Sequence, residues 1–307
     1  MPDLARLGFD KYMEFLEPAD LKKYIHSGFL SKIDLIIISR DKVKQFDLEG
    51  SLLQAHLAGI PIIDASEITS RVAGRVLLDQ TDLSSYLLCA TQKTQLCRIL
   101  LRIKYILEPV AAVALSILLS PILLIVALLV KLTSPGPIFY RQIRTGYLGK
   151  PFELVKFRSM VVDAEVNGPQ WSTSNDARVT SFGHFLRRTR IDELPQLWNV
   201  MRTEISFIGP RPERPEIYEQ LKSQVPLFSL RTLVRPGITG YAQVCSGYAA
   251  SSAESLLKLE YDLFYIQHMS LRFDLSILVK TFKVVFVGDK ANPKVVPSTS
   301  QPLAVSQ

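Results

Sequence analysis

Two adjacent carboxylates, Asp192 and Glu193, are notable because cationic side chains and a proline surround them. A carboxylate beside arginines keeps a low pKa and stays ionised, so it can serve as a nucleophile or a metal ligand. Two adjacent acids can divide these roles, with one attacking phosphorus while the other holds Mg²⁺. The structural alternative, which this segment alone favours, is that Asp192 caps a helix starting near Leu194-Pro195 and Glu193 complements its dipole. The arginines lie just upstream: Arg187, Arg188 and Arg190.

Further cationic side chains could bind phosphate. Lys156 and Arg158 follow an expected short strand at residues 152–155, and residues two apart on a strand point to one face, so the pair could hold a diphosphate. Arg211 lies in the proline-rich segment 209–215 (GPRPERP), which is stiff and would present a fixed guanidinium. The alternatives are a solvated basic edge strand and a rigid connector whose arginines pair with surface acids.

An uncharged apolar run, residues 110–130, precedes the elements that must position these side chains. At a rise of about 1.5 Å per residue it could just cross a hydrocarbon core of about 30 Å. Ser120-Pro121 lies at its midpoint, where proline can kink a helix. Basic residues flank both ends, and they favour the cytoplasmic side, so a helix that bends and leaves by the same face satisfies both flanks. A straight span with a tolerated proline is equally compatible with this run alone.

Residues 1–97 are expected to form a partial α/β unit and a linker. A buried strand at 34–39, a helix at 52–58 and a second strand at 60–64 predict a parallel pair. The sequence contains no Gly-x-Gly, which excludes the usual dinucleotide-binding fingerprint. Residues 98–288 form a second region, mixed in pattern after the apolar run, and the tail 289–307 is expected to be disordered.

Composition agrees with one membrane segment in a chain that can form one large or two modest domains. The 307 residues are 48% hydrophobic, with a mean hydropathy of +0.17. The net charge of +7 suits an anionic lipid surface, a phosphorylated substrate or nucleic acid, and does not choose among them. The three cysteines (Cys89, Cys97 and Cys245) lack metal-like spacing, so reduced thiols are expected.

Six motifs occur in order along residues 134–266: SPGP (134–137), KFRSM (156–160), DELPQLWNV (192–200), GPRPERP (209–215), RPGITG (235–240) and YDLFYI (261–266). In this order, after one apolar segment, they resemble the bacterial sugar transferase family. Its members are monotopic phosphoglycosyl transferases that act on polyprenyl phosphate. The resemblance covers residues 98–288, and the upstream unit resembles the end of the nucleotide-binding-like domain of the longer members.

The resemblance implies an α+β fold, in which a re-entrant helix hairpin broken at Ser120-Pro121 precedes a mostly helical catalytic domain at the membrane face. It implies Asp192 as the nucleophile and Glu193 as a Mg²⁺ ligand. Cations from the motifs and their surroundings would then offset the charge of the substrate phosphates. These cations are Lys156, Arg158, Arg187 and Arg211.

The implied reaction moves a sugar-1-phosphate from a UDP-sugar to polyprenyl (undecaprenyl) phosphate through a phosphosugar-aspartyl intermediate, releasing UMP. The implied place is the cytoplasmic face of the bacterial inner membrane, at the first membrane step of exopolysaccharide or other surface glycan synthesis. Other glycan-assembly enzymes are further partners that this role allows, and nucleic acid is not an expected partner.

Two rival functions follow from the same sequence. A non-catalytic membrane scaffold is disfavoured by the intact Asp192-Glu193 pair. A membrane-tethered nucleic-acid or regulatory protein is disfavoured because basic runs interleaved with aromatics and a helix-turn-helix pattern are absent from the sequence. The sequence departs from the family at 243–246, where Gln-Val-Cys-Ser stands in place of a Gln-Val-Asn-Gly pattern.

Residues 275–287 (LSILVKTFKVVFV) form a last apolar segment, broken by Lys280 and Lys283. One interpretation is a helix lying in the membrane interface with its lysines reaching head groups. An ordinary packed C-terminal helix fits the same spacing.

Overall fold

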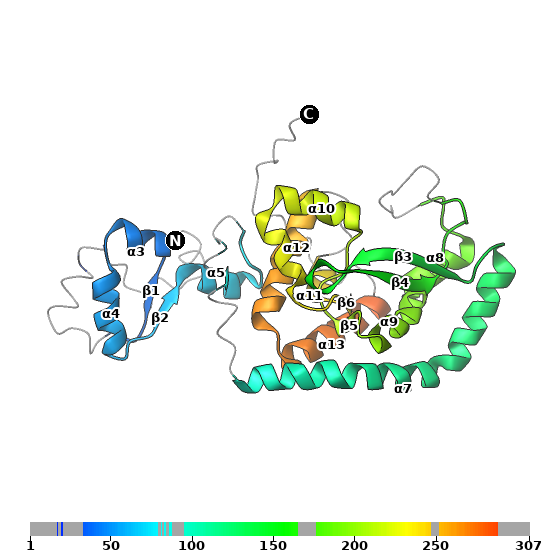
Figure 1. Cartoon of the computed structure of the whole chain (residues 1–307), viewed down its shortest axis with the longest axis horizontal. Coiled ribbons are helices and arrows are strands. Elements are labelled where there is room, and N and C mark those ends of the chain that lie inside the picture. The colour runs from blue at the N-terminus through cyan, green and yellow to red at the C-terminus, as the bar shows by residue number, and fades with distance from the viewer. Residues whose placement is uncertain are drawn as a thin grey trace, which may run out of the picture. The chain divides into compact units, whose positions relative to one another are not determined.

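The computed structural model describes residues 33–78, 95–164, 176–246 and 252–287, together with isolated positions between 17 and 87. The chain divides into two compact units, Met1–Cys89 and Ala90–Gln307, which are described separately (Figure 1). The sequence places this boundary a few residues later, after residue 97. The tail 289–307 and Cys89 lie outside the described residues.

The first unit contains a parallel pair of strands, as the sequence predicts. Strand β1 (Ile36–Ile38) pairs with β2 (Ile62–Asp64), and Ile36 lies opposite Ile62. Helices α3 (Arg40–Gln45) and α4 (Glu49–Leu57) connect the strands, and α5 (Ala65–Ala73) follows. Asp64 caps α5 by accepting a hydrogen bond from the Ser66 amide at 2.8 Å.

The apolar segment of the second unit lies within one 39-residue helix, α7 (Gln95–Thr133). Among the described residues it is the helix long and apolar enough to cross a membrane. Figure 1 shows α7 running along the base of the unit and then turning toward β3. Its interior contains Pro109 and Pro121. The two-armed hairpin that the sequence suggests is not seen, because the backbone stays helical through Ser120-Pro121.

One side of α7 is buried against the rest of the second unit over most of its length. The buried side chains are spaced by four residues near each end: Lys104, Glu108, Ala112, Val126 and Val130. Ala112 packs in a cluster with Phe152 and Leu197, and Val126 packs with Phe157. The opposite side exposes a long series of large apolar residues, so α7 lies lengthwise on the unit with its apolar side outward.

A buried polar network fixes the first half of α7. The Lys104 ammonium lies 2.7 Å from Asp274 Oδ2 and 3.3 Å from the Tyr265 hydroxyl. Glu108 Oε1 accepts a 2.6 Å hydrogen bond from Ser206 Oγ. Because these charges are buried, removing one partner would leave the other uncompensated, so the network specifies how the helix docks.

Two small sheets and several short helices form the remainder of the second unit (Figure 1). Strands β3 (Phe139–Thr145) and β4 (Pro151–Phe157) form an antiparallel hairpin, while β5 (Ser206–Ile208) and β6 (Gly237–Thr239) pair in parallel. The helical elements are η3 (Tyr147–Gly149), α8 (Ser181–Thr189), η4 (Ile191–Gln196), α9 (Leu197–Met201), α10 (Pro215–Gln224), η5 (Pro226–Leu233), α11 (Tyr241–Cys245), α12 (Ser252–His268) and α13 (Leu271–Val287).

Helix α13 combines a buried face and an exposed apolar face. Ile277 is fully buried in the main core with Tyr241, Tyr261 and Tyr265. The exposed apolar residues recur at helical spacing: Leu271, Leu275, Val279 and Phe282. The helix is therefore packed, as one interpretation of its sequence requires, and it also presents an apolar stripe outward, as the other requires.

Candidate active site

Asp192 and Glu193 lie in η4, a short 3₁₀ helix between α8 and α9, and both are buried. The N-cap positions of η4 and α9 are Arg190 and Gln196, so Asp192 does not cap either helix. Its Oδ1 atom is buried and has no hydrogen-bond partner among the residues that the structure describes. An unpaired buried carboxylate oxygen is costly, which points to a functional rather than a capping role.

Glu193 sits in a different electrostatic environment from its neighbour. Its Oε1 atom accepts a 2.9 Å hydrogen bond from Arg211 and lies 3.7 Å from Arg190 Nη1. Burial acts to raise the pKa of Glu193, but the charges of Arg211, Arg190 and Lys156 outweigh it and lower that pKa. Burial and the charge of Glu193 raise the pKa of Asp192. The two acids are therefore electrostatically distinct although they are adjacent.

Arg190 brings its charge to the site through an unusual backbone conformation. Its φ of 58° lies in the left-handed region, at the C-cap of α8 where glycine is common. The turn made there redirects the chain from α8 into η4 and places Asp192 and Glu193 two and three residues later. A strained residue at this position is in keeping with a functional site.

Lys156 and Arg144 extend the positive region, from strands β4 and β3. Burial and the charges of Arg211 and Arg144 lower the pKa of Lys156 to about 8. Lys156 also acts electrostatically on both carboxylates. Burial lowers the pKa of Arg144 to about 10, and its Nη1 donates to the Pro212 carbonyl at 3.1 Å. Crowded cations of this kind are stabilised by an anion, so the region is suited to phosphate.

Arg158 is held by the SPGP turn. Arg158 is buried, and its Nη2 donates to the Ser134 carbonyl at 2.6 Å. A side chain at Gly136 would collide with the Arg158 guanidinium, so the glycine of the SPGP turn makes room for it. Strand β4 ends at Phe157, so Arg158 lies one residue beyond it. Binding of phosphate by Arg158 remains a prediction.

Arg187, at the end of α8, lies closer to the acids. Its Nε donates to Ser159 Oγ at 2.9 Å, and its charge lowers the pKa of Asp192 against the larger effect of burial. Lys156, Arg187, Arg190 and Arg211 thus act on the Asp192-Glu193 pair from three different parts of the chain.

Close backbone packing holds the loop that carries Arg211. The loop follows β5, and the Gly209 amide donates to the Thr239 carbonyl of β6 at 2.9 Å. The Gly237 amide donates to the Pro210 carbonyl at 3.0 Å. A side chain at Gly237 would lie 2.1 Å from the Gly209 nitrogen, so glycine is required for this approach. The GPRP and RPGITG motifs therefore form one structural unit.

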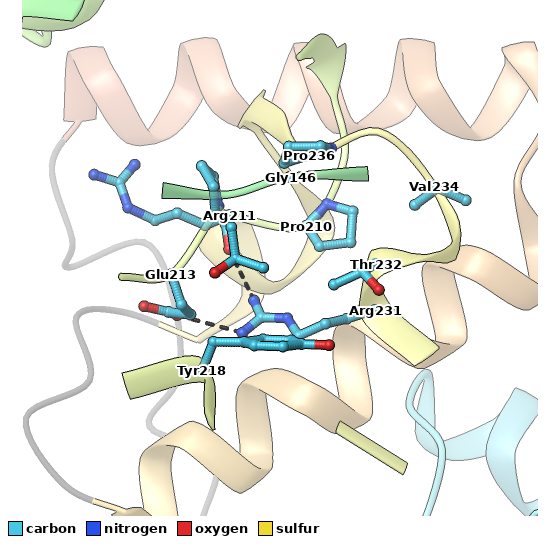
Figure 2. A pocket seen from close by; sticks show the side chains of 11 residues that line it. Gly146, Pro210, Arg211, Glu213, Tyr218, Arg231, Thr232, Val234 and Pro236 are labelled. Atoms are coloured by element: carbon cyan, nitrogen blue, oxygen red, sulfur yellow. Dashed lines mark hydrogen bonds and ion pairs between the residues drawn. The ribbon is translucent and has the colours of Figure 1, made fainter. Parts of the chain in front are cut away.

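Arg231 stabilises the same loop through hydrogen bonds and ion pairs. Its Nη2 donates to the Arg211 carbonyl at 3.0 Å and to Asp262 Oδ2 at 2.7 Å, and its Nη1 lies 3.4 Å from Glu213 Oε1. Figure 2 shows the contacts of Arg231 with Arg211 and Glu213 around a small pocket, with the guanidinium of Arg211 extending away from Arg231. Asp262 belongs to the YDLFYI motif, so that motif helps to position Arg211.

Among the side chains that contact the site or its supports without having been predicted are Gln243 and Asn199. Gln243 Oε1 accepts a 3.0 Å hydrogen bond from Arg211, and Gln243 belongs to the segment that departs from the family pattern. The departing residue Cys245 packs against the core instead, where burial raises its pKa. Asn199 joins α9 to β4, because its amide donates to the Glu153 carbonyl and accepts from the Val155 amide. The motif DELPQLWNV contains Asn199, but its spacing does not reveal that partner.

The carboxylate pair fits Mg²⁺ in the presence of a diphosphate. The described parts of the chain contain no cluster of three or more His, Cys, Asp or Glu side chains that could hold a metal ion. Mg²⁺ commonly takes one or two carboxylates together with substrate phosphates and water. The orphaned Asp192 Oδ1 and the adjacent Glu193 supply oxygen donors of that kind.

The motifs that form this site match a known protein family. The sequence profile described as "Bacterial sugar transferase" matches residues 99–288, which include most of α7, the acidic pair and every loop of the site. The chain belongs to this family. The family membership predicted from the six motifs is therefore confirmed.

Curated relatives of this bacterial sugar transferase have related names. It is 36% identical over 298 residues to a UDP-N-acetylgalactosamine-undecaprenyl-phosphate N-acetylgalactosaminephosphotransferase of Aeromonas hydrophila, covering 94% of this chain and 68% of that protein. It is 42% identical over 281 residues to a UDP-glucose:undecaprenyl-phosphate glucose-1-phosphate transferase of Escherichia coli (strain K12), covering 91% and 54%. A Klebsiella pneumoniae protein of the same name is 44% identical over 57% of this chain and 38% of its own length. The chain thus spans between about a third and two thirds of these relatives.

Proposed function

We propose that this protein transfers a sugar-1-phosphate from a UDP-sugar to undecaprenyl phosphate, releasing UMP and initiating the synthesis of a surface polysaccharide. The observation that carries the proposal is the buried Asp192-Glu193 pair, ringed by cations, within a chain whose curated relatives are named for this reaction. The nature of the sugar is left open, because the relatives' names include both N-acetylgalactosamine and glucose.

The first step forms a covalent intermediate on Asp192. A carboxylate oxygen of Asp192 forms a bond to the β-phosphorus of the UDP-sugar, the bond from that phosphorus to the bridging oxygen breaks, and UMP leaves with the electron pair. Lys156, Arg187 and Arg211 bind and orient the diphosphate and offset its charge. Glu193 would hold Mg²⁺, which supplies further charge neutralisation on the phosphates when it is bound.

The second step passes the phosphosugar to the lipid. An oxygen of undecaprenyl phosphate attacks the same phosphorus, the bond to Asp192 breaks, and the carboxylate is restored as polyprenyl-diphosphate-sugar leaves. Two displacements let one carboxylate serve a soluble donor and a membrane acceptor in turn. The apolar outer side of α7 supports a place for this reaction at the membrane, and we assign it to the cytoplasmic face.

Purified protein incubated with radiolabelled UDP-sugars and undecaprenyl phosphate tests the proposal. Release of UMP together with label in the lipid fraction is expected for one or more sugars of the panel, and chelation of divalent cations is expected to stop both. Absence of both products across the panel would support a non-catalytic scaffold instead.

A further inference from the structure

One turn of α7, from Lys104 to Glu108, makes polar contacts with strand β5. Glu108 Oε1 accepts hydrogen bonds from Ser206 Oγ at 2.6 Å and from the Phe207 amide at 3.3 Å. The Lys104 ammonium donates to the Ile208 carbonyl at 3.3 Å. All three residues of β5 are therefore bonded to this turn, which the two displacements of the proposed reaction do not use.

These contacts are shielded from water. Glu108 is 7% exposed and Lys104 8% exposed, and Ser206 is fully buried. The Tyr265 hydroxyl lies 3.1 Å from the same Ile208 carbonyl that Lys104 contacts. Charge-assisted hydrogen bonds are short and strong, and burial strengthens them further, so this turn of α7 holds β5 firmly in place.

Strand β5 leads directly into the loop that carries Arg211. Gly209 and Pro210 are the two residues between them, and both form backbone hydrogen bonds with the segment that contains β6. The Arg211 guanidinium follows at once and donates to Glu193 Oε1 at 2.9 Å. A displacement of β5 is therefore expected to move the Arg211 guanidinium relative to the acidic pair.

The same turn of α7 also contacts the second loop of this unit. The guanidinium carbon of Arg235 lies 4.7 Å from the centroid of the Tyr105 ring, which is a cation–π contact. Arg235 begins the RPGITG motif, and a side chain at Gly209 would lie 2.4 Å from its carbonyl oxygen. Residues 104–108 therefore contact both halves of the structural unit that the GPRP and RPGITG motifs form.

We propose that Glu108 is a positioning residue of the donor site, which acts through β5 to hold Arg211 against Glu193. This inference rests on the proposed function, since it assigns a residue to the binding of that reaction's diphosphate. Glu108 contacts β5 rather than the acidic pair, so its effect on the substrate is indirect. Because Glu108 belongs to α7, the docking of this apolar helix and the geometry of the donor site depend on the same side chain.

Glu108→Leu tests the assignment, because leucine has a similar size and cannot accept the hydrogen bonds from β5. Binding of UDP with Mg²⁺ to the purified protein in nanodiscs, measured by calorimetry, is expected to weaken by about tenfold, within the roughly hundredfold that a displacement of about 1 Å can cost. Glu108→Gln keeps an acceptor oxygen and is expected to bind UDP within about threefold of the wild type, since neutral hydrogen bonds are about half as strong as charge-assisted ones. Unaltered binding in Glu108→Leu would refute the positioning role.

Leu101→Ala is the matched control for a loosened α7. Leu101 lies about one turn earlier on the same helix and packs against the main core, and its side chain donates and accepts no hydrogen bond. This change is expected to lower the free energy of unfolding, while UDP binding stays within about twofold of the wild type. Weakening of UDP binding by Leu101→Ala equal to that by Glu108→Leu would show a general effect of helix docking and would overturn the assignment.

A double-mutant cycle with Arg211→Gln decides whether Glu108 acts through Arg211. In the Arg211→Gln background, Glu108→Leu is expected to change UDP binding by less than about twofold, because the group that it positions is gone. An effect of about tenfold in both backgrounds would contradict the proposed route.

The binding cycle also separates this inference from the proposed function. UDP binding that follows the expected cycle, without sugar-phosphate transfer from any UDP-sugar, would refute the proposed function and keep the positioning role of Glu108. Should Glu108→Leu not fold, Ser206→Ala removes the other partner of the 2.6 Å hydrogen bond and enters the same cycle.

Discussion

Asp192 and Glu193 are chemically similar side chains, but their surroundings shift their pKa values in opposite directions. Burial raises the pKa of Asp192, whereas Arg211, Arg190 and Lys156 overcome burial and lower the pKa of Glu193. Opposite shifts in a pair of acids are the usual basis for dividing two roles between them. We therefore propose the acid with the unpaired oxygen, Asp192, as the nucleophile, while the arginines around Glu193 favour its charged form.

Asp192→Asn is expected to abolish UMP release and the labelling of protein by UDP-sugar, because an amide oxygen does not form the aspartyl phosphate. If Asp192 acted as a helix cap, the same change would be nearly neutral, since asparagine caps about as well as aspartate. The measurement is mass spectrometry of the peptide that contains residues 191–200, after reaction with UDP-sugar alone.

Asp163→Asn is the matched control, because Asp163 is exposed and lies outside the site. It is expected to retain wild-type rates. An Asp192→Asn enzyme that turns over near the wild-type rate would rule out Asp192 as the nucleophile.

Lys156 predicts a pH dependence for donor binding. With a pKa of about 8, its ammonium loses its charge as the pH rises through that value, so the phosphates lose one cationic partner at higher pH. The KM for the UDP-sugar is expected to rise above pH 8, by up to about tenfold per pH unit. Steady-state kinetics from pH 6.5 to pH 10 measure this effect.

Lys156→Arg provides the comparison, because arginine stays protonated across this range. Its KM is expected to stay level where that of the wild type rises. Identical pH profiles for the two enzymes would assign the dependence to another group.

Sequence reasoning located the residues whose chemistry is local. Asp192, Glu193, Lys156 and Arg211 all act on one site, and each was recognisable from its own motif. Gln243 was not recognisable, because its hydrogen bond to Arg211 joins residues 32 positions apart and no spacing rule encodes it. The placement of Arg158 was missed because its partner is a backbone carbonyl in a distant turn.

At the scale of elements, the hydrogen bonds of Asn199 connect α9, and η4 directly before it, to the β3–β4 hairpin. Asn199→Ala is expected to reduce the free energy of unfolding by about 1–3 kcal/mol, since it leaves the partly buried hydrogen bonds to the Val155 amide and the Glu153 carbonyl unmade. The isosteric change Asn199→Asp is expected to destabilise more, because its carboxylate would face Glu204. Chemical denaturation in detergent measures both variants.

Glu204→Gln is expected to rescue much of the stability lost by Asn199→Asp, because the amide removes the like charge. It is expected to leave Asn199→Ala unimproved. Equal stabilities of Asn199→Ala and Asn199→Asp would show that the hydrogen bond to Glu204 carries little of the effect.

The contacts of Arg231 with Asp262, Glu213 and the Arg211 carbonyl also join separate elements of the second unit. Asp262→Ala is expected to lower the free energy of unfolding by about 3–5 kcal/mol, because it leaves the buried guanidinium with less compensation. The double change Arg231→Met with Asp262→Leu is expected to recover part of that loss, since it removes the charge as well. Thermal unfolding followed by fluorescence compares them. A double variant no more stable than the single one would show that packing, not charge, dominates.

Elements with a strong local sequence pattern were predictable, and elements without one were not. The strand at 152–155 and the parallel pair of the first unit were found at nearly the predicted positions. Strands β5 and β6 have three residues each, and their pairing depends on glycines 28 positions apart in sequence. The hairpin expected at Ser120-Pro121 became one bent helix, because proline removes a single hydrogen bond and a long apolar helix tolerates that loss.

At the scale of the whole second unit, both halves of α7 pack against the same folded body. Lys104 and Glu108 bind at one end, and Val126 and Val130 pack at the other. Both ends of the helix are therefore expected on one side of the membrane. In a variant whose native cysteines are replaced by serine, Arg102→Cys and Thr133→Cys should both react with an impermeant thiol reagent from the cytoplasmic side.

Labelling from opposite sides would show a full crossing and would exclude this topology. Pro121→Leu is the informative companion, because a straighter helix is expected to favour crossing, with loss of transferase activity.

The network around Lys104 also bears on how the protein is made. Lys104 and its partner Tyr265 are 161 residues apart, so the ribosome completes the second long after the first. Translation proceeds at about 5–20 residues per second, so on the order of ten seconds or more pass between the synthesis of Lys104 and that of its partners. Throughout this time Lys104 lies in an apolar helix without them. During that interval its charge needs water or lipid phosphate, which keeps the start of α7 at the membrane surface while the rest of the chain emerges. The docked arrangement of α7 can therefore form only after synthesis has passed α12 and α13, which makes docking of α7 onto its unit a late event in the biogenesis of this enzyme.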